Sequence, residues 1–234
     1  MKAKALVSWS SGKDSAWTLH VLRQQAEVEV VGLLTTYNEV FDRVAMHGVR
    51  RELVEAQAAA AGLPLWLVPL PSPCSNDVYE ERMRAVVERA KSHGITAIAF
   101  GDLFLADIRA YRERQLSGTG ITPLFPLWNT AAATHSLAHQ MLAGGLKAAL
   151  SCVDPQHLSP SQFVGREFDY QLLEELPAGV DPCGEKGEFH TICYAGPMFT
   201  SPLAIRRGDI VERQGFWFCD FVLDEARGSS QVAR

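Results

Sequence analysis

The first half of this 234-residue chain alternates short apolar runs with longer stretches of helical pattern, and few folds accommodate that order. Strands that alternate with helices are typical of βα units, in which each helix returns the chain to a parallel sheet. Five strands are expected, over residues 5–9, 28–35, 65–70, 95–100 and 146–153. The pattern therefore predicts a doubly wound α/β fold whose five-stranded parallel sheet binds ligands at the carboxyl ends of its strands.

The last third of the chain has a different pattern, with a short helix near residues 168–176 and a turn-rich segment over residues 177–187. Strand-like pieces follow near residues 190–194 and 215–223. We expect an N-terminal domain over residues 1–130, a smaller α+β domain over residues 131–225 and a disordered tail over residues 226–234.

The composition of the chain limits the kinds of molecule that it is expected to bind. The formal net charge of −5 gives no general basic field, so a nucleic-acid partner is not expected. No apolar stretch of membrane-spanning length and no secretory cleavage pattern is found, and the five cysteines are widely scattered. These features predict a cytoplasmic protein with reduced thiols. The apolar segment over residues 215–223 either completes a sheet or forms a dimer contact, and we favour a homodimer.

The first expected strand runs directly into the sequence S-S-G-K-D-S, and a helical pattern follows at once. A strand, a turn of small residues and a helix N-terminus form an anion site, because unpaired backbone N–H groups and the helix dipole point at the ligand. The alternative is an ordinary helix start, since Ser and Asp are common turn and capping residues. The candidate phosphate ligands are Ser10, Ser11, Gly12, Lys13, Asp14 and Ser15.

The spacing of this loop does not fit the Walker A motif. The form S-[GS]-G-x-D-S after a first strand resembles the loop of the N-type ATP pyrophosphatases, or PP-loop family, which holds the leaving pyrophosphate while the substrate receives AMP. Many of those proteins have glycine where this chain has Ser11, so a cost in backbone freedom is expected there. The resemblance implies that ATP binds here with Mg²⁺.

Adenine is expected near the end of the second strand, within Leu34-Thr35-Thr36-Tyr37. Met46 and His47 follow after a short loop and can close over the base or ribose, or simply form a helix-entry contact. The sequence F-G-D-L after the fourth strand adds Gly101 to the nucleotide site and Asp102 to the catalytic candidates.

Three arginines follow Asp102 within about three helical turns. Guanidinium groups near a strand end can bind an anionic substrate, and Arg109 and Arg112 are the candidates. The alternative is a solvated helix with ion pairs, which we prefer for Arg114.

The segment P-C-G-E-K-G-E-F-H-T over residues 182–191 carries more polar groups than a plain surface turn needs. Glu185 or Glu188 can orient ammonia, accept a proton or bind magnesium, and His190 can act as an acid or base near neutral pH. The alternative is a charged turn that enters a strand. Substrate contacts are predicted at Gly184, Gly187 and Thr191.

Taken in order, S-S-G-K-D-S, F-G-D-L and C-G-E-K-G-E-F-H-T followed by G-P-M-F resemble the diphthine-ammonia ligase family, from about Lys4 to Asp224. The resemblance implies a HUP-type nucleotide domain followed by a smaller family-specific domain. Those ligases activate the carboxylate of diphthine, a modified histidine on translation elongation factor 2, as an acyl-adenylate that ammonia converts to an amide. The predicted catalytic residues are Asp102, Glu185, Glu188 and His190.

Family membership leaves the acceptor open, because bacterial relatives exist although bacteria lack diphthamide. The acceptor is therefore either the modified histidine or an unknown carboxylate. Two other functions compete with the ligase: a non-catalytic ATP-binding module, and a PP-loop enzyme that acts on RNA or another small molecule. Paired cysteines or a basic domain would favour an RNA substrate, and the sequence has neither.

Overall fold

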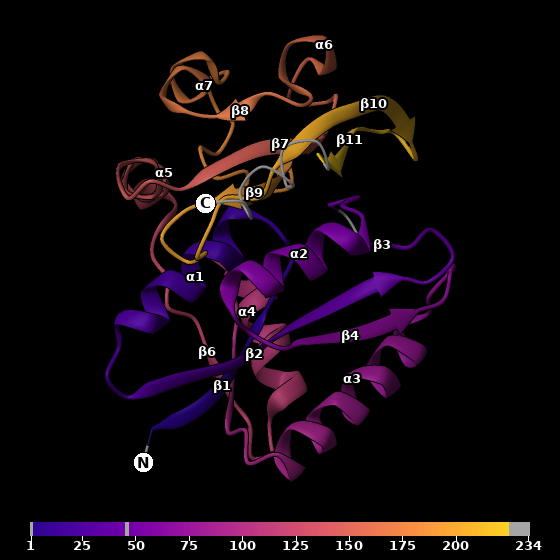
Figure 1. Ribbon diagram of the computed structural model, residues 1–234, viewed down its shortest axis with the longest axis vertical. Helices are drawn as coiled ribbons and strands as arrows, with labels where there is room; N and C mark the ends of the chain where they lie inside the picture. Colours follow the sequence, from indigo (N-terminus) through magenta and orange to yellow (C-terminus); the bar gives the residue numbers. More distant parts are fainter. Residues whose placement is uncertain (1, 45–46, 225–234) are drawn as a thin grey trace, which may run out of the picture.

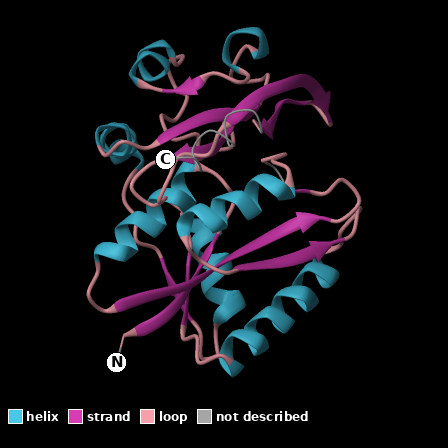
Figure 2. Ribbon diagram, viewed as in Figure 1, coloured by secondary structure: helices cyan, strands magenta, loops and turns pink. Residues whose placement is uncertain are grey.

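The structure is a computed structural model that describes residues 2–44 and 47–224. Two sheets lie one above the other with helices between and around them (Figures 1 and 2). The first sheet has six strands in the order β3-β2-β1-β5-β6, with β4 also paired to β2. Its strands are β1 (Ala3–Ser8), β2 (Val28–Asn38), β3 (Arg43–Val44), β4 (Leu65–Leu70), β5 (Ala97–Ala99) and β6 (Thr122–Leu124).

All pairings of the first sheet are parallel except the short β2–β3 ladder. Its strands are connected by α1 (Lys13–Gln24), α2 (Arg51–Ala61), α3 (Asn76–Ser92) and α4 (Ala106–Leu116). β1 lies between β2 and β5, where the strand order reverses, so the loops after β1 and β5 flank the place at which doubly wound sheets bind ligands. The predicted doubly wound α/β class is confirmed.

The second sheet is smaller and antiparallel, in the order β10-β11-β7-β8 with β9 paired to β7. Its strands are β7 (Lys147–Val153), β8 (Glu167–Phe168), β9 (Phe189–Ala195), β10 (Ile205–Arg213) and β11 (Phe216–Leu223). A 3-10 turn (Ala131–Ala133) and the helices α5 (Thr134–Ala143), α6 (Pro160–Phe163) and α7 (Tyr170–Glu175) accompany it. The predicted second α+β unit is therefore present, and the apolar segment over residues 215–223 completes its sheet.

Two apolar cores hold these layers together. One joins α1 and α2 to the second sheet and contains Trp17, Leu53 and Leu150. The other lies on the opposite face of the first sheet and contains Val87 of α3, Leu116 of α4 and Ile98 of β5. In Figure 1, α1 and α2 accordingly lie between the two sheets and α3 lies on the far side of the first sheet. The larger core makes the second sheet a direct neighbour of α1, α2 and the first sheet.

Local sequence explains where the main helices begin and end. The hydroxyl of Ser75 accepts a hydrogen bond from the backbone N–H of Val78 and caps the start of α3. Gly62 directly follows α2 in the left-handed conformation that ends helices at low cost.

Three expectations about strands need correction. Residues 146–153, expected as the fifth strand of the first sheet, form β7 in the middle of the second sheet. A continuous apolar run fits any strand buried on both faces, so its pattern does not say which sheet it joins. The edge of the parallel sheet is instead β6, and the two-residue β3 brings the sheet to six strands. β10 was not predicted, because charged residues interrupt it and most of it is exposed.

The expected tail over residues 226–234 lies outside the described residues. Within residues 2–44 and 47–224, no helix has both the length and the apolar character needed to cross a bilayer.

Candidate active site

The loop between β1 and α1 is held by its own side chains. The Ser10 hydroxyl accepts a hydrogen bond from the Gly12 backbone N–H at 3.3 Å and lies 3.2 Å from the Ser15 hydroxyl, which donates to the Gly12 carbonyl at 3.0 Å. Ser11 has a φ of 73°, in the left-handed region that L-residues seldom occupy. Ser11 therefore has the restricted backbone conformation that the sequence predicts at this position.

Gly12 lies against the second half of the chain. A Cβ atom at this position would come within 2.9 Å of Cε1 of His47 and 3.2 Å of the Thr191 carbonyl oxygen. The backbone of Gly12 is extended and suits any residue, so contact and not conformation restricts this position to glycine.

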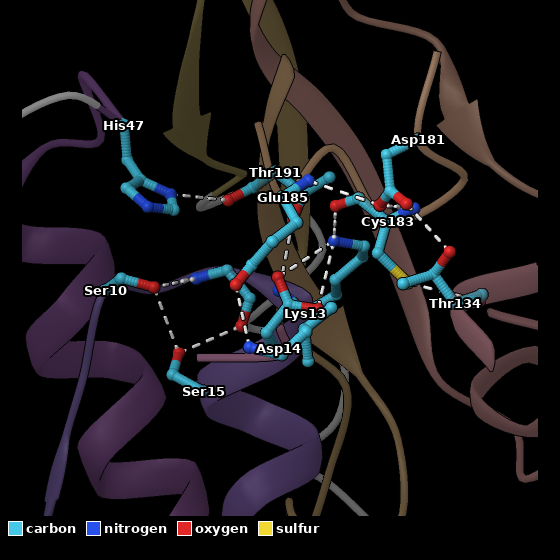
Figure 3. Close-up of polar contacts among 12 residues, drawn as sticks. Ser10, Lys13, Asp14, Ser15, His47, Thr134, Asp181, Cys183, Glu185 and Thr191 are labelled. Atoms are coloured by element: carbon cyan, nitrogen blue, oxygen red, sulfur yellow. Dashed lines mark hydrogen bonds and ion pairs between the residues drawn. The ribbon is translucent and has the colours of Figure 1, made fainter. Parts of the chain in front are cut away.

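The start of β9 docks directly on the loop. The backbone N–H of Lys13 donates to the Thr191 hydroxyl at 3.0 Å, and the N–H of Cys193 donates to the Ser11 carbonyl at 2.9 Å. Figure 3 shows Lys13 extending from the loop to the carbonyl of Cys183. The two sheets therefore build the site together.

Lys13 is an almost completely buried cation, with 2% of its side chain exposed. Its ammonium lies 2.8 Å from the Asp14 carboxylate. Burial alone would lower the pKa of Lys13, but the charge and hydrogen bond of Asp14, together with the nearby Cys183 and Glu185, outweigh it, and the pKa lies above its usual value. Lys13 is thus a permanent positive charge beside the expected phosphates.

A cavity of about 490 Å³ opens at the carboxyl ends of β1 and β5, a size typical of small-molecule sites. It brings together predicted residues from both halves of the chain. These are Ser10, Lys13, Asp14, Ser15, His47, Gly101, Asp102, Arg112, Gly184, Glu185, His190 and Thr191.

Three carboxylates face this cavity: Asp14, Asp102 and Glu185. Glu185 accepts a hydrogen bond from the backbone N–H of Leu103 at 2.7 Å, and burial raises the pKa of Glu185 to about 7. Burial also raises the pKa of Asp102, against the opposing effect of Arg112. Among the described residues, Oδ2 of Asp102 accepts no hydrogen bond, and it forms an ion pair with Nε of Arg112 at 3.7 Å. The cavity therefore holds one carboxylate oxygen that is only loosely paired.

Two imidazoles lie near the loop, with the ring centroids of His47 and His190 4.6 Å apart and the rings tilted by 38°. Burial lowers the pKa of His190 to about 3 and that of His47 to about 4. Nδ1 of His47 lies 3.2 Å from the Thr191 carbonyl (Figure 3). Nε2 of His190 is buried without a hydrogen-bond partner among the described residues, and the role of His190 as an acid or base stays a prediction.

Other predicted residues lie behind or beside the cavity. The side chain of Ser11, within the loop, is fully buried. The buried Thr35 donates its hydroxyl to the Trp9 carbonyl at 2.8 Å. Gly187 adopts a φ of 92° in a turn with open space around it. Met46 lies outside the described residues.

Glu188 is 1% exposed and points into the protein. Its two oxygens accept hydrogen bonds from the backbone N–H groups of Asp181 and Lys186, at 2.9 and 3.0 Å. Asp181 in turn accepts from the Thr134 hydroxyl at 2.7 Å and the Cys183 N–H at 2.9 Å. Glu188 and Asp181 therefore shape the segment that presents Glu185 to the cavity.

The two arginines expected to bind substrate separate on α4. Arg112 lines the cavity, 3.7 Å from the carboxylate of Asp102. Arg109 lies over the rings of Phe125 and Trp128, at 4.8 Å from each, and forms an ion pair with Glu113.

Part of the cavity wall was not predicted. It includes Tyr79, Met83 and Phe100, which together with Leu34 of the expected adenine segment form an apolar surface. Tyr79 and Met83 lie four residues apart on one face of an expected helix, and Phe100 ends an expected strand. Those positions were a usable signal for a ligand wall.

Comparison with known proteins gives matches over nearly the whole chain. Residues 1–122 match the model of the diphthamide synthase N-terminal domain, and residues 135–230 match that of the diphthamide synthase C-terminal domain. The chain is 25% identical over 235 residues to the diphthine-ammonia ligase of Bos taurus and 24% identical to that of Homo sapiens, covering 90% of this chain and 85% of each relative. It is 26% identical over 217 residues to that of Danio rerio, covering 84% of both chains. The resemblance inferred from the sequence motifs is confirmed.

Proposed function

Because this chain belongs to the diphthamide synthase family, we propose that it is an ATP-dependent ligase that joins ammonia to a carboxylate and releases AMP and pyrophosphate. One observation carries the proposal: the loop over residues 10–15 and the carboxylate of Glu185 line a single cavity. A phosphate site and a proton acceptor are the two requirements of adenylation followed by amide formation.

ATP would place its phosphates at the start of α1. Backbone N–H groups there, the hydroxyls of Ser10 and Ser15 and the buried ammonium of Lys13 supply the donors and the positive charge. The adenine would lie against Leu34, Thr36 and Phe100, the wall nearest the ends of β2 and β5. The unpartnered Nε2 of His190 is suited to a phosphate oxygen near the α position.

Magnesium fits this cavity by the chemistry of its ligands. Mg²⁺ prefers oxygen ligands and is usually held by one or two carboxylates together with substrate phosphates. Asp14 and Asp102 face the cavity, and Oδ2 of Asp102 accepts no hydrogen bond among the described residues, although it forms an ion pair with Arg112 at 3.7 Å. When bound, the ion would offset the negative charge of the phosphates.

In the first step, an oxygen of the acceptor carboxylate would attack the α-phosphorus while the bond to pyrophosphate breaks. In the second, ammonia would attack the acyl carbon and AMP would leave. Ammonium must lose a proton before it can attack, and the amide nitrogen must lose another. Glu185 is the proposed acceptor, because its pKa of about 7 leaves part of its population as carboxylate at neutral pH.

The remaining predictions are kept as parts of this proposal. The domain limits of 1–130 and 131–225 agree with the end of β6 at Leu124 and the start of α5 at Thr134. We propose a cytoplasmic location, and all five cysteines are free thiols in the structure. The acceptor is either diphthine on an elongation factor or another carboxylate.

The test is AMP and pyrophosphate formation from α-labelled ATP with Mg²⁺ and an ammonium salt. The acceptors would be diphthine-bearing elongation factor 2 and, separately, free carboxylic acids. The expected result is AMP that depends on both acceptor and ammonium. ATP binding without AMP under any of these conditions would reject the ligase and favour a binding module.

Glu185→Gln sharpens this assay. Removal of the proton acceptor is expected to lower turnover about 10- to 100-fold and to raise the KM for ammonium, with the KM for ATP unchanged. Turnover equal to that of the native protein would remove Glu185 from the mechanism.

A further inference from the structure

A second cavity, of about 340 Å³, lies between α3 and α4 and shares part of its wall with the nucleotide cavity. The shared residues are Tyr79, Met83, Phe100 and Arg112. We propose that this α3–α4 groove binds the carboxylate-bearing arm of the acceptor, and that Arg112 binds its carboxylate. The inference rests on the ligase function proposed above and names the place where its second substrate enters.

Arg112 has the geometry of a carboxylate site. Its guanidinium lies over the ring of Phe100, 5.0 Å from the centroid. Nε lies 3.7 Å from Oδ2 of Asp102, an ion pair too long for a hydrogen bond, and Nε has no hydrogen-bond partner among the described residues. An arginine fork matches two carboxylate oxygens, so the guanidinium can bind an incoming carboxylate more closely than it binds Asp102.

The position of Arg112 fits the order of the reaction. It lines both cavities, so a carboxylate bound there lies at the edge of the cavity that the phosphates of ATP would fill. The guanidinium also neutralises the acceptor, which otherwise approaches a triphosphate of the same sign.

The rest of the groove suits a flexible aliphatic arm. Its floor includes the buried side chains of Val87, Ile98 and Leu116, which can cover methylene groups. Its outer side is polar, and Gln115 of α4 donates a hydrogen bond to Glu80 of α3 across the groove at 3.0 Å. A ligand with an anionic group at the end of an apolar chain therefore fits the groove: the anion meets Arg112, and the chain covers the apolar floor.

The first test compares substitutions on the face of α4 that lines the groove with the same kinds of substitution on its exposed face. Arg112→Lys keeps the charge and loses the fork, and Gln115→Trp fills the groove without touching the nucleotide cavity. Arg114→Lys and Arg114→Trp are the matched controls, because the exposed Arg114 lines neither cavity.

Both groove variants are expected to raise the KM for the acceptor about tenfold or more, with the KM for ATP within about twofold of native and the controls unchanged. Thermal unfolding confirms that each variant is folded. Diphthine-bearing elongation factor 2 and free propionate, succinate and glutarate are run as separate acceptors, so that a protein-borne arm and a free acid are distinguished. If Gln115→Trp keeps the native KM for the acceptor, the proposal that the acceptor binds in the groove is wrong.

A second measurement does not depend on turnover. Gln115→Cys is made together with Cys74→Ser, because Cys74 is the exposed cysteine and the other four are buried. The acceptor alone is expected to slow modification of the new thiol by N-ethylmaleimide about fivefold or more, and ATP alone is expected to leave the rate unchanged. Protection by ATP and not by the acceptor would overturn the proposal.

The two proposals fail in different ways. If the native protein forms no AMP with any acceptor, the ligase function is rejected and the groove with it. If AMP forms and the groove variants keep the native KM for the acceptor, the groove alone is rejected.

Discussion

The loop over residues 10–15 and the segment over residues 181–191 are both held by hydrogen bonds among their own residues and by bonds to distant partners, but they use their polar side chains differently. Both line the same cavity. In the loop, one sequence motif specifies the turn, the helix start and the anion site together. In the segment, neighbouring carboxylates have opposite orientations, because Glu185 faces the cavity and Glu188 faces the interior.

This difference explains why a high density of polar residues in a sequence does not by itself show which of them face a ligand. In the loop, four of the five polar side chains line the cavity, so the motif and the candidate site nearly coincide. A longer segment must also satisfy its own backbone N–H groups in a buried place, and some of its polar side chains do that. In this protein Asp181 and Glu188, away from the cavity, accept hydrogen bonds from backbone N–H groups, whereas Glu185 both accepts one from the Leu103 N–H and lines the cavity.

The largest effect is expected from Gly12→Val. The added side chain would displace His47 and the Thr191 carbonyl, and with them the start of β9. ATP affinity should fall about 100-fold or more, measured by calorimetry, with a smaller fall for Gly12→Ala. Full affinity in Gly12→Val would show that the loop does not need the second sheet against it.

Glu188→Gln tests whether the segment contains a structural carboxylate. An amide has a single acceptor oxygen, so one of the two backbone N–H groups would lose its partner. The free energy of unfolding in urea should fall by about 1–3 kcal/mol.

Glu185→Gln is the matched control for stability, because its amide oxygen can still accept from the Leu103 N–H. It should unfold at the same urea concentration as the native protein. Equal stability of Glu188→Gln and Glu185→Gln would contradict the division of roles within this segment.

The smallest effect is expected from Asp220→Asn, which loosens the turn that brings His47 to both regions. Asp220 on β11 accepts hydrogen bonds from Arg43 at 2.7 Å and from Arg50 at 2.7 and 3.0 Å, on either side of that turn. Burial raises the pKa of Asp220, but hydrogen bonds from Arg50 and Arg43 outweigh this and lower it to about 2.

Because the folded-state pKa is below the ordinary value of 3.8, the stabilisation is present above pH 3.8 and is lost as the pH falls toward 2. Since Arg50 is partly exposed, the loss in Asp220→Asn at pH 7 should be about 1–2 kcal/mol. Urea unfolding at pH 7 and at pH 2 checks this, and a difference that persists at pH 2 would show that charge is not the cause.

Local pattern was sufficient for the fold class and for the turn and helix start over residues 10–15. The apolar runs of β1, β2 and β4, the glycine after α2 and the serine before α3 each act within a few residues. Residues 147–153 join the second sheet because they pair with β9 and β11, and the sequence of these residues does not show those distant pairings.

The same limit applies to single side chains. Arg109 and Arg112 lie less than one turn apart on α4, and only the positions of Phe125 and Trp128 decide that Arg109 turns away from the cavity. Thr35, expected at the adenine, is buried and donates its hydroxyl to the Trp9 carbonyl. The catalytic and binding roles assigned to the cavity residues stay predictions.

The contact between Lys13 and Cys183 has a consequence for how the protein is made. The hydrogen bonds from Lys13 to Cys183 and Thr191 span 170 and 178 residues, so a ribosome completes most of the chain before the loop meets its partners. Such distant pairings form late, because a long intervening chain must first be ordered. A nascent chain therefore carries its nucleotide loop through synthesis without an assembled site, and a prematurely released fragment would consume no ATP.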